Sequence, residues 1–279
     1  MAEVVITPRR TNISYLKELW AAKNLWRALV LRELRLRYKQ TALGFLWVIL
    51  QPLLGTVIFT MIFGGLFASN DPNQPPYALF VLSGLVFWNL FSDGVNFATN
   101  SFLNLGDLMK KIYFPRFLAP LASVCVAAVN FGINWGLFII LWVVFWQRQV
   151  GSGLINWGLM WLLPILIIAS WWLALALGTL MATISVKWRD IKHALPFFLQ
   201  MLLFLSPVIY PDRILSPTMT YISYLNPMTA IISLVHSIFF ASPLPDGHLI
   251  LMSAGMLIII SMGSWCFFRK RERFFADII

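Results

Sequence analysis

The sequence predicts an all-α integral membrane protein with six transmembrane helices, an N-terminal cytoplasmic amphipathic helix and an outer-face re-entrant hairpin. Composition is the first observation, because 59% of the 279 residues are hydrophobic and only 11% are charged, against about 25% charged in soluble domains. The apolar residues also fall in runs long enough to cross a bilayer, which takes about 20 residues in a helix. The basic residues, finally, are confined to a few segments between these runs. These features exclude a cytosolic enzyme, a disulfide-rich secreted protein and a disordered chain.

Six apolar segments are predicted to cross the membrane. They run from about residue 43 to 67, 78 to 100, 117 to 146, 157 to 184, 194 to 210 and 248 to 268. The chain is therefore divided into a cytoplasmic arm (1–42), a six-span transmembrane domain (43–268) and a cytoplasmic tail (269–279). The two cysteines, Cys125 and Cys266, lie in apolar stretches and are interpreted as buried hydrophobic side chains.

The basic residues fix the predicted orientation. Of the 21 lysines and arginines, nine lie in the arm, three in 108–116, three in 187–192 and four in 269–273. All these segments fall on one side of the six-span layout, and the positive-inside rule places that side in the cytoplasm. Both termini are therefore expected in the cytoplasm. The net charge of +10 is then explained by topology, and nucleic acid is not expected as a partner.

The stretch from 196 to 245 holds seven of the fifteen prolines and is predicted to contain a hairpin. Its second apolar run, 228–241, is about 21 Å long as a helix, which is too short to cross the membrane. A crossing there would also place the basic tail outside. We expect instead a re-entrant or interfacial hairpin on the outer face. Broken backbone at membrane depth is tolerated inside protein or beside water, so the hairpin either borders a pathway or caps the outer surface.

One face of the second span carries a row of polar side chains. Its members, all within about 80° on a helical wheel, are Asn89, Asp93, Asn96, Asn100 and Asn104. The third span adds Asn130 and Asn134. Because amides are costly in lipid, these faces are expected either to line a channel for a hydroxyl-rich cargo or to join helices by hydrogen bonds. Asp93 is the only acid inside a span and has no basic partner nearby in sequence. A proton-relay role is disfavoured, because a proton-coupled carrier usually needs more such groups.

Small residues mark two further faces that we expect to pack closely against other helices. Gly132 and Gly136 form a G-x-x-x-G in the third span, and Ala174, Gly178 and Ala182 share a face of the fourth.

The arm from 11 to 40 is predicted to be a helix that lies on the cytoplasmic surface. Its basic residues explain anchoring to anionic lipid. A sharper hypothesis is that Arg35, Arg37 and Lys39 also attract a phosphate-bearing substrate at the entrance of a pathway. No G-x-x-x-x-G-K-[ST] loop occurs in the chain, so ATP is not expected to bind here by that route. No acid pair, metal cluster or nucleophile triad occurs in or near the spans.

Several motifs, taken in order, resemble ABC-type polysaccharide export permeases. The first are LRYKQTALGFLW at 36–47 with QPL at 51–53, and LMKKIYFPR at 108–116. They are followed by KWRD at 187–190, SPVIYP at 206–211, YLNP at 224–227 and RERFFAD at 271–277. The resemblance covers the chain from about residue 30 to its end.

The resemblance implies a six-span permease that works as a homodimer with two copies of a separate ABC ATPase, in the bacterial inner membrane. The chain itself would be no enzyme and hold no cofactor, with ATP and Mg in the partner. The implied cargo is a polyprenyl-diphosphate-linked polysaccharide, such as an O-antigen, capsule or teichoic acid. The implied ATPase-coupling residues are Lys110, Lys111, Tyr113, Phe114, Pro115, Arg116, Arg189 and Asp190. The implied outer-gate residues are Ser206, Pro207, Tyr210, Asn226 and Pro227.

Two alternatives remain open at this point. One is an ABC permease for a small lipid, drug or haem-like cargo, and the other is a membrane glycosyl- or acyltransferase. A spacious conduit would favour a glycan as the cargo, whereas a dry, closed dimer interface would favour a lipid or drug. A cluster of acids or histidines at one membrane face would favour a transferase.

Overall fold

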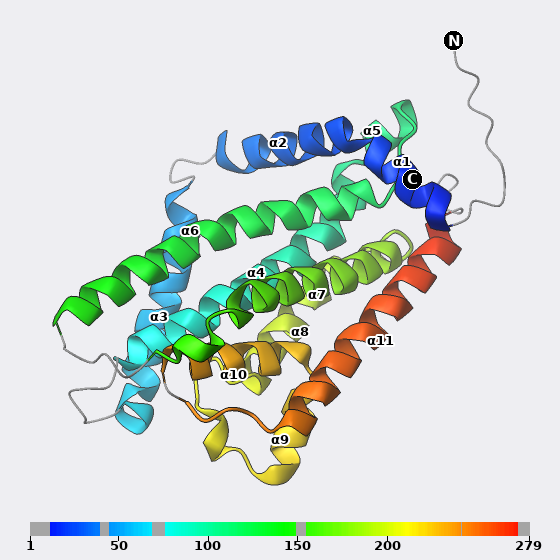
Figure 1. Ribbon diagram of the computed structural model, residues 1–279. Helices are drawn as coiled ribbons and strands as arrows, with labels where there is room; N and C mark the ends of the chain where they lie inside the picture. The colour runs from blue at the N-terminus through cyan, green and yellow to red at the C-terminus, as the bar shows by residue number, and fades with distance from the viewer. Residues whose placement is uncertain (1–11, 40–44, 69–75, 149–154, 241, 273–279) are drawn as a thin grey trace.

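A computed structural model describes residues 12–39, 45–68, 76–148, 155–240 and 242–272, and in these residues all regular structure is helical (Figure 1). Two 3₁₀ turns, at Trp157–Leu159 and Asp212–Ile214, complete it. The helices are α1 Asn12–Ala21, α2 Lys23–Lys39, α3 Leu46–Phe67, α4 Tyr77–Asn104, α5 Gly106–Lys111, α6 Leu118–Arg148, α7 Leu162–Ser185, α8 Ile191–Leu205, α9 Pro217–Tyr224, α10 Pro227–Phe239 and α11 Gly247–Arg271.

Five of the predicted spans are long helices. Helices α3, α4, α6, α7 and α11 are each long and apolar enough to cross a membrane, which confirms an all-α membrane fold. The fifth predicted span differs from expectation. It is the 15-residue α8, which begins three residues earlier and ends at Leu205, because Ser206 turns into extended backbone. As a helix of about 22 Å it is shorter than an ordinary span.

Helices α7 and α11 run side by side in the same direction. Ser264 donates a hydrogen bond to the carbonyl of Ala176, and Trp172 donates to the hydroxyl of Ser261. The C-terminal end of α7 therefore lies at the same end of the domain as that of α11. Ser185 also donates to the carbonyl of Thr99, so α4 ends there too. We call this the basic end, because α1, α2, α5, the α7–α8 turn and the arginines that close α11 meet there (Figure 1).

Helix α8 joins the basic end to the opposite end, despite its length. It follows the α7–α8 turn, and four residues beyond it the carbonyl of Ile209 accepts a hydrogen bond from Tyr77, the first residue of α4. Since α4 runs toward the basic end, Tyr77 and Ile209 mark the opposite end. The chain from Ile191 to Ile209 thus passes through the domain once.

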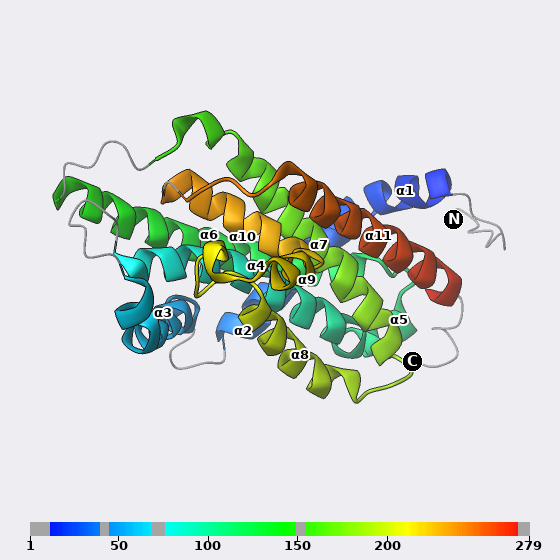
Figure 2. The same ribbon diagram turned by 90° about the horizontal axis from the view of Figure 1, so that it is seen from below.

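Helix α10, in contrast, begins and ends on the same side. Next to its first residue, Asn226 donates to Ser206 at the end of α8, and near its end the carbonyl of Ile238 accepts from the backbone of Asn156, before α7. Both contacts lie at the opposite end of the domain. A bend of 107° separates α9 from α10. This geometry fits the predicted hairpin rather than a crossing, and Figure 2 shows α9 lying across this end.

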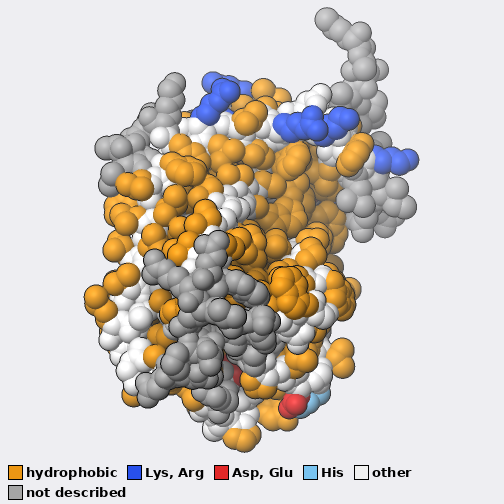
Figure 3. All heavy atoms as spheres, turned by 60° about the vertical axis from the view of Figure 1, so that its left-hand side comes forward, with side chains coloured by type: hydrophobic (Ala, Val, Ile, Leu, Met, Phe, Trp, Pro, Cys, Tyr) orange, Lys and Arg blue, Asp and Glu red, His pale blue; other side chains and the backbone are white. Residues whose placement is uncertain are grey.

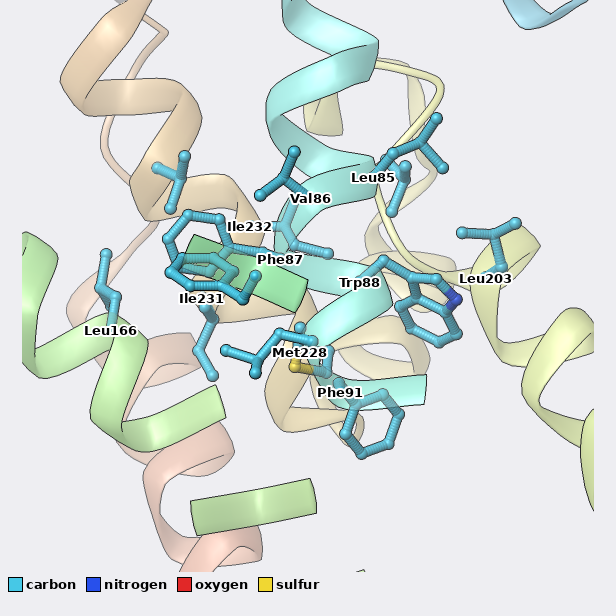
Figure 4. Packing of buried hydrophobic residues seen from close by; sticks show 14 of the residues in the cluster. Leu85, Val86, Phe87, Trp88, Phe91, Leu166, Leu203, Met228, Ile231 and Ile232 are labelled. Atoms are coloured by element: carbon cyan, nitrogen blue, oxygen red, sulfur yellow. The ribbon is translucent and has the colours of Figure 1, made fainter. Parts of the chain in front are cut away.

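The hairpin is not a surface cap, because α10 is inserted into the domain. All thirteen of its residues are buried. Figure 4 shows Met228, Ile231 and Ile232 of α10 against Val86 and Phe87 of α4. Since lipid is as apolar as these side chains, close packing rather than removal from water holds them together.

Among the described glycines, those at which two helices approach most closely lie between α4 and α7. A β-carbon built on Gly178 would lie 2.6 Å from that of Ala98, and one built on Gly94 would lie 2.8 Å from that of Ala174. The small-residue face of the fourth span thus packs as predicted. The expectation for Gly132 and Gly136 does not hold within this chain, because a β-carbon at either position would meet no atom within 4 Å.

Charge and hydrophobicity are separated on the surface. Figure 3 shows lysine and arginine side chains at the basic end, above a broad hydrophobic band, and an acidic and a histidine side chain near the other end. Large apolar side chains of α3 and α8, such as Met61 and Phe197, are exposed. This distribution is what a bilayer-spanning domain requires.

The close approach of α4 and α7 generates a stability prediction. Gly178→Ala will force the two helices apart and lower the free energy of unfolding by about 1–3 kcal/mol, the usual cost of overpacking. Thermal unfolding of the protein in detergent, followed by size-exclusion chromatography, measures this. Gly263→Ala in α11 is the matched control, because its added β-carbon meets nothing within 4 Å. Equal melting temperatures for the two variants would contradict the packing described here.

Candidate functional site

The polar residues of α4 lie on its partly exposed face. Asn89, Asp93, Asn96 and Asn100 are neither buried nor fully exposed, whereas the opposite side of α4 is closed by α6, α7 and α10. Asn100 donates to the backbone carbonyl of Asn96. Within the described residues, the side chains of Asn89 and Asn96 make no hydrogen bond. These two amides are therefore available to another molecule.

Helices α3 and α8 flank this face and meet over the part of it nearer the opposite end of the domain. A β-carbon built on Gly55 of α3 would lie 3.3 Å from the side chain of Leu85, one turn before Asn89. The rings of Phe59 in α3 and Phe204 in α8 meet edge to face, with centroids 6.5 Å apart. Nearer the basic end, Asn96 and Asn100 remain partly exposed. The amide-bearing face of α4 is thus enclosed, at the opposite end of the domain, between two largely exposed apolar helices.

Arg37 reaches from α2 onto the same face of α4. Its guanidinium carbon lies 3.3 Å from the ring centroid of Phe97, and it interacts electrostatically with Asp93. Asn130 of α6 lies beside Asp93, and its side-chain oxygen accepts a 2.5 Å hydrogen bond from Tyr38. The one acid in a predicted span therefore has a basic partner, which the sequence separation had hidden. We call these five residues the Arg37 network.

A second acid helps to dock α2 on α6. Glu33 is buried, and its Oε1 accepts a 2.7 Å hydrogen bond from Ser123. Its other oxygen, Oε2, is buried without a hydrogen-bond partner. Burial raises the pKa of Glu33, while Ser123 and Arg37 lower it. The inner face of α2 therefore carries specific polar contacts to the spans, and more than lipid attraction holds this helix in place.

The 112–117 segment at the basic end has one exposed and one buried side. Tyr113 is 62% exposed, whereas Phe114 is 5% exposed. The ring of Phe114 belongs to a buried cluster with Tyr15, Phe102 and Phe268. Lys111, Arg189 and Asp190 are exposed at the same end, Pro115 is buried, and Arg116 donates to the carbonyl of Glu272. The side chain of Lys110 lies outside the described residues.

The predicted outer-gate residues are brought together at the opposite end. Asn226 donates a 2.9 Å hydrogen bond to the hydroxyl of Ser206, and its own side-chain oxygen caps α10 at Met228. Tyr210 donates to the carbonyl of Phe204. The neighbouring Pro207 and Pro227 are both buried. The end of α8 and the start of α10 thus form one connected unit.

Comparison with known proteins decides the family. Residues 24–240 match the ABC-2 type transporter family. The chain belongs to the ABC-2 type transporter family. It is 28% identical over 269 residues to the O-antigen export system permease protein RfbA of Myxococcus xanthus, a match that covers 96% of this chain and all of that protein. Klebsiella pneumoniae RfbA is 25% identical, covering 89% of this chain and 92% of that protein. The polysialic acid transport protein KpsM of Escherichia coli is 25% identical, covering 74% and 78%.

These matches confirm the family resemblance drawn from the motifs, and the structure refines several of the residues named with it. Phe114 does not face outward, so a contact with an ABC ATPase would fall to its exposed neighbours. Arg37 is committed to Phe97 and Asp93, whereas Arg35 is exposed. The side chain of Lys39 lies outside the described residues. In the third span, Asn130 joins helices and Asn134 is buried with an unpaired oxygen.

Two buried polar residues of this ABC-2 transporter were not singled out from the sequence. Glu33 follows Arg32 and precedes Arg35, so its position reads as part of a charged helix face. His236 is buried in α10, stacked on Phe80 with ring centroids 3.7 Å apart, and its Nε2 lies 3.2 Å from the carbonyl of Phe80. A histidine inside a 13-residue apolar run was the available signal, because such a residue requires a polar partner.

The Arg37 network generates a prediction for a double-mutant cycle. Arg37→Gln and Asp93→Asn will each lower the free energy of unfolding by about 1–3 kcal/mol, because each leaves a charged group without its partner. The double variant will lose less than the sum of the two. Unfolding in detergent measures all three, and Arg35→Gln on the exposed side of α2 is the control. Additive losses would mean that the two charges do not interact.

Substitutions on the two sides of the 112–117 segment are expected to differ in their effect on stability. Phe114→Ala will destabilise the protein by about 3–5 kcal/mol, because it empties a buried aromatic position. Tyr113→Ala will change stability by less than about 0.5 kcal/mol, as exposed substitutions usually do. Melting temperatures of the two purified variants provide the measurement. If Phe114→Ala melts like the parent protein, the cluster around it does not support the segment.

Proposed function

We propose that this chain is the membrane subunit of an ATP-driven exporter for a polyprenyl-diphosphate-linked polysaccharide of the O-antigen, capsular or teichoic acid type. It would act as a homodimer with two copies of an ABC ATPase in the bacterial inner membrane, with both termini in the cytoplasm. The observation that carries the proposal is the full-length similarity to permeases named for O-antigen export. The similarity to KpsM, named for polysialic acid transport, extends the same cargo class.

The partly exposed amide face of α4 supports a glycan cargo. Asn89, Asn96 and Asn100 offer hydrogen bonds that a sugar can exchange for water without binding tightly. Aromatic rings such as Phe59 and Phe204 at its outer end offer apolar faces on which a sugar ring can pack. In a homodimer, the exposed sides of α3 and α8 would meet their counterparts and complete the wall. Lipid-linked glycan would then pass along the amides toward the hairpin.

The arrangement of the basic end supports coupling to a separate ATPase. The sequence holds no phosphate-binding loop of the P-loop kind, so ATP and Mg would be held by the partner. The partner would seat the segment from Lys110 to Arg116, with Lys111 and Tyr113 exposed to it. Arg189 and Asp190 lie at the same end and would border that interface. Nucleotide-driven movement of the ATPases would displace both segments.

Exposed arginines of α2 support attraction of a diphosphate. Arg35 and Arg32 point to the surface and provide sites for paired, charge-assisted hydrogen bonds to phosphate. Arg37 would instead form the inner boundary of this region, since its guanidinium already lies over the ring of Phe97. A diphosphate headgroup would therefore be attracted at the surface of α2 before its glycan reaches Asn100.

Each of the two alternative functions would be favoured by a specific observation. An ABC permease for a small lipid or drug is favoured only if the dimer interface closes over the amides of α4. A glycosyl- or acyltransferase would be favoured by a cluster of acids or histidines at one membrane face.

The deciding experiment is reconstitution of the chain with its ATPase in proteoliposomes. Lipid-linked glycan made accessible to an external glycosidase, in an ATP-dependent manner, is the expected result. Transport of a short-chain lipid or a drug in place of the glycan would establish the first alternative. Transfer of sugar or acyl groups by the chain alone would establish the second.

The amide face generates a prediction in the same assay. Asn96→Trp and Asn100→Trp will lower glycan export at least about tenfold, because a large ring fills the face along which the cargo passes. The ATPase should still co-purify with both variants. Ile258→Trp is the matched control, because it places the same ring on an exposed apolar position of α11. Normal export by the two Asn variants would mean that the polar face of α4 serves only to pack helices together.

A further inference from the structure

A group of side chains at the basic end joins three segments that are far apart in the sequence. Tyr15 of α1 is buried, and its hydroxyl donates a 2.8 Å hydrogen bond to Oε1 of Glu272 at the end of α11. The same hydroxyl accepts a 3.4 Å hydrogen bond from the backbone nitrogen of Phe117. Arg116 donates to the backbone carbonyl of Glu272. We call Tyr15, Arg116, Phe117 and Glu272 the basic-end clamp.

Two further side chains of α11, Arg269 and Trp265, pack against the basic-end clamp. The second carboxylate oxygen of Glu272 lies 3.2 Å from Nη1 of Arg269, whose guanidinium lies 4.3 Å from the ring centroid of Tyr15. Trp265 packs edge to face against both Tyr15 and Phe117, with centroids 5.9 and 5.5 Å away. Burial and the carboxylate of Glu272 raise the pKa of Tyr15 well above its ordinary range. The hydroxyl therefore keeps its proton and remains a donor.

The contacts of the basic-end clamp connect distant segments as well as closing the C-terminal end of α11. An ion pair between positions three apart, such as Arg269 and Glu272, stabilises an isolated helix only weakly. Arg116, by contrast, attaches the 112–117 segment to the end of α11 across 156 residues of sequence. Tyr15 of α1 bridges the same two elements, because its hydroxyl contacts both Phe117 and Glu272. Any displacement of that segment must either break them or move the end of α11.

Helix α11 carries the connection to the opposite end of the domain. Its 25 residues span about 37 Å as one helix. Near its start, Ser253 donates a 2.6 Å hydrogen bond to the carbonyl of Tyr224 in α9. Leu249 packs with Tyr224 and with Ala230 of α10. A single helix thus touches the exposed loop at one end and the buried hairpin at the other.

We propose that Tyr15 and Glu272 are positioning residues that lock the 112–117 segment to α11, so that α11 transmits displacement of this segment to the α9–α10 hairpin. The proposal rests on the proposed function, because it takes this segment as the seat of the ATPase. It adds a mechanical route from ATPase to outer gate and assigns roles to α1 and to the end of α11. In this proposal, movement of the ATPase displaces the 112–117 segment, and the orientation of the α9–α10 hairpin changes in response.

Paired spin labels test the lock directly. Lys111→Cys and Lys270→Cys, both exposed, are labelled in the full chain with Cys125→Ala and Cys266→Ser, with and without the ATPase. In the otherwise unchanged protein, the distance between the labels will stay constant when a non-hydrolysable ATP analogue binds to the complex. Tyr15→Phe removes one hydroxyl and keeps the ring, and it will broaden this distance distribution. Glu272→Gln will broaden it as well, because it removes the pair with Arg269.

Export per ATP hydrolysed is the functional readout. Tyr15→Phe will lower this ratio about tenfold while hydrolysis itself stays within about twofold, because the interaction lost is worth roughly one order of magnitude in an equilibrium. Trp20→Phe, which removes an exposed N–H from the same helix α1 and keeps an aromatic ring, is the matched control and will leave both readouts unchanged.

Two results would overturn the lock. One is an unchanged label distance and an unchanged ratio in Tyr15→Phe. The other is a lower melting temperature with hydrolysis and export reduced in proportion, which would show a structural role alone. Failure of the ATPase to bind the parent protein would contradict the proposed function instead. The label distances in the chain alone would still decide whether Tyr15 and Glu272 hold the segment.

Discussion

The close approach of α4 to α7 is the constraint on which the rest of the structure depends. With Gly94 and Gly178 at the contact, the two backbones come within a distance that a single added methyl group would prevent. This approach makes α4 the central helix, with α6, α7, α3, α10 and α8 all packed against it. Because apolar burial gives little driving force between helices in lipid, such shape matching has to supply the cohesion. The amide face is then the one side of α4 that the packing leaves partly open.

Polar contacts hold segments together at both ends of the domain. At the opposite end, Asn226 donates to Ser206, and Tyr224 donates to a carboxylate oxygen of Asp212. At the basic end, Tyr15 donates to Glu272, and arginines take part as well: Arg269 pairs with Glu272, and Arg37 interacts electrostatically with Asp93. The contacts of these arginines are the ones that an approaching charged partner would perturb.

Most of the fold could be predicted from the sequence, because membrane crossing depends on segment length and on the placement of basic residues. The same reasoning identified a hairpin within 196–245, since the apolar run of 14 residues at 228–241 is too short to cross. What could not be predicted were contacts between distant segments. The partner of Asp93 lies 56 positions away on another helix, and Phe114 has the same local pattern whether its ring faces inward or outward. Just beyond the early end of α8, Val208 packs closely against Gly84 of α4, a contact that no local pattern records.

The buried position of α10 has a consequence for how the protein is made. A helix of thirteen residues with a histidine and several hydroxyl groups in it is too short and too polar to partition into the bilayer as a span by itself. Both of its ends are satisfied by other segments, through Ser206 and Asn156. It can therefore take its place only after α4, α7 and α8 have been inserted and have come together. Biogenesis then includes a folding step inside an assembled bundle, at which quality control could detect a defective chain.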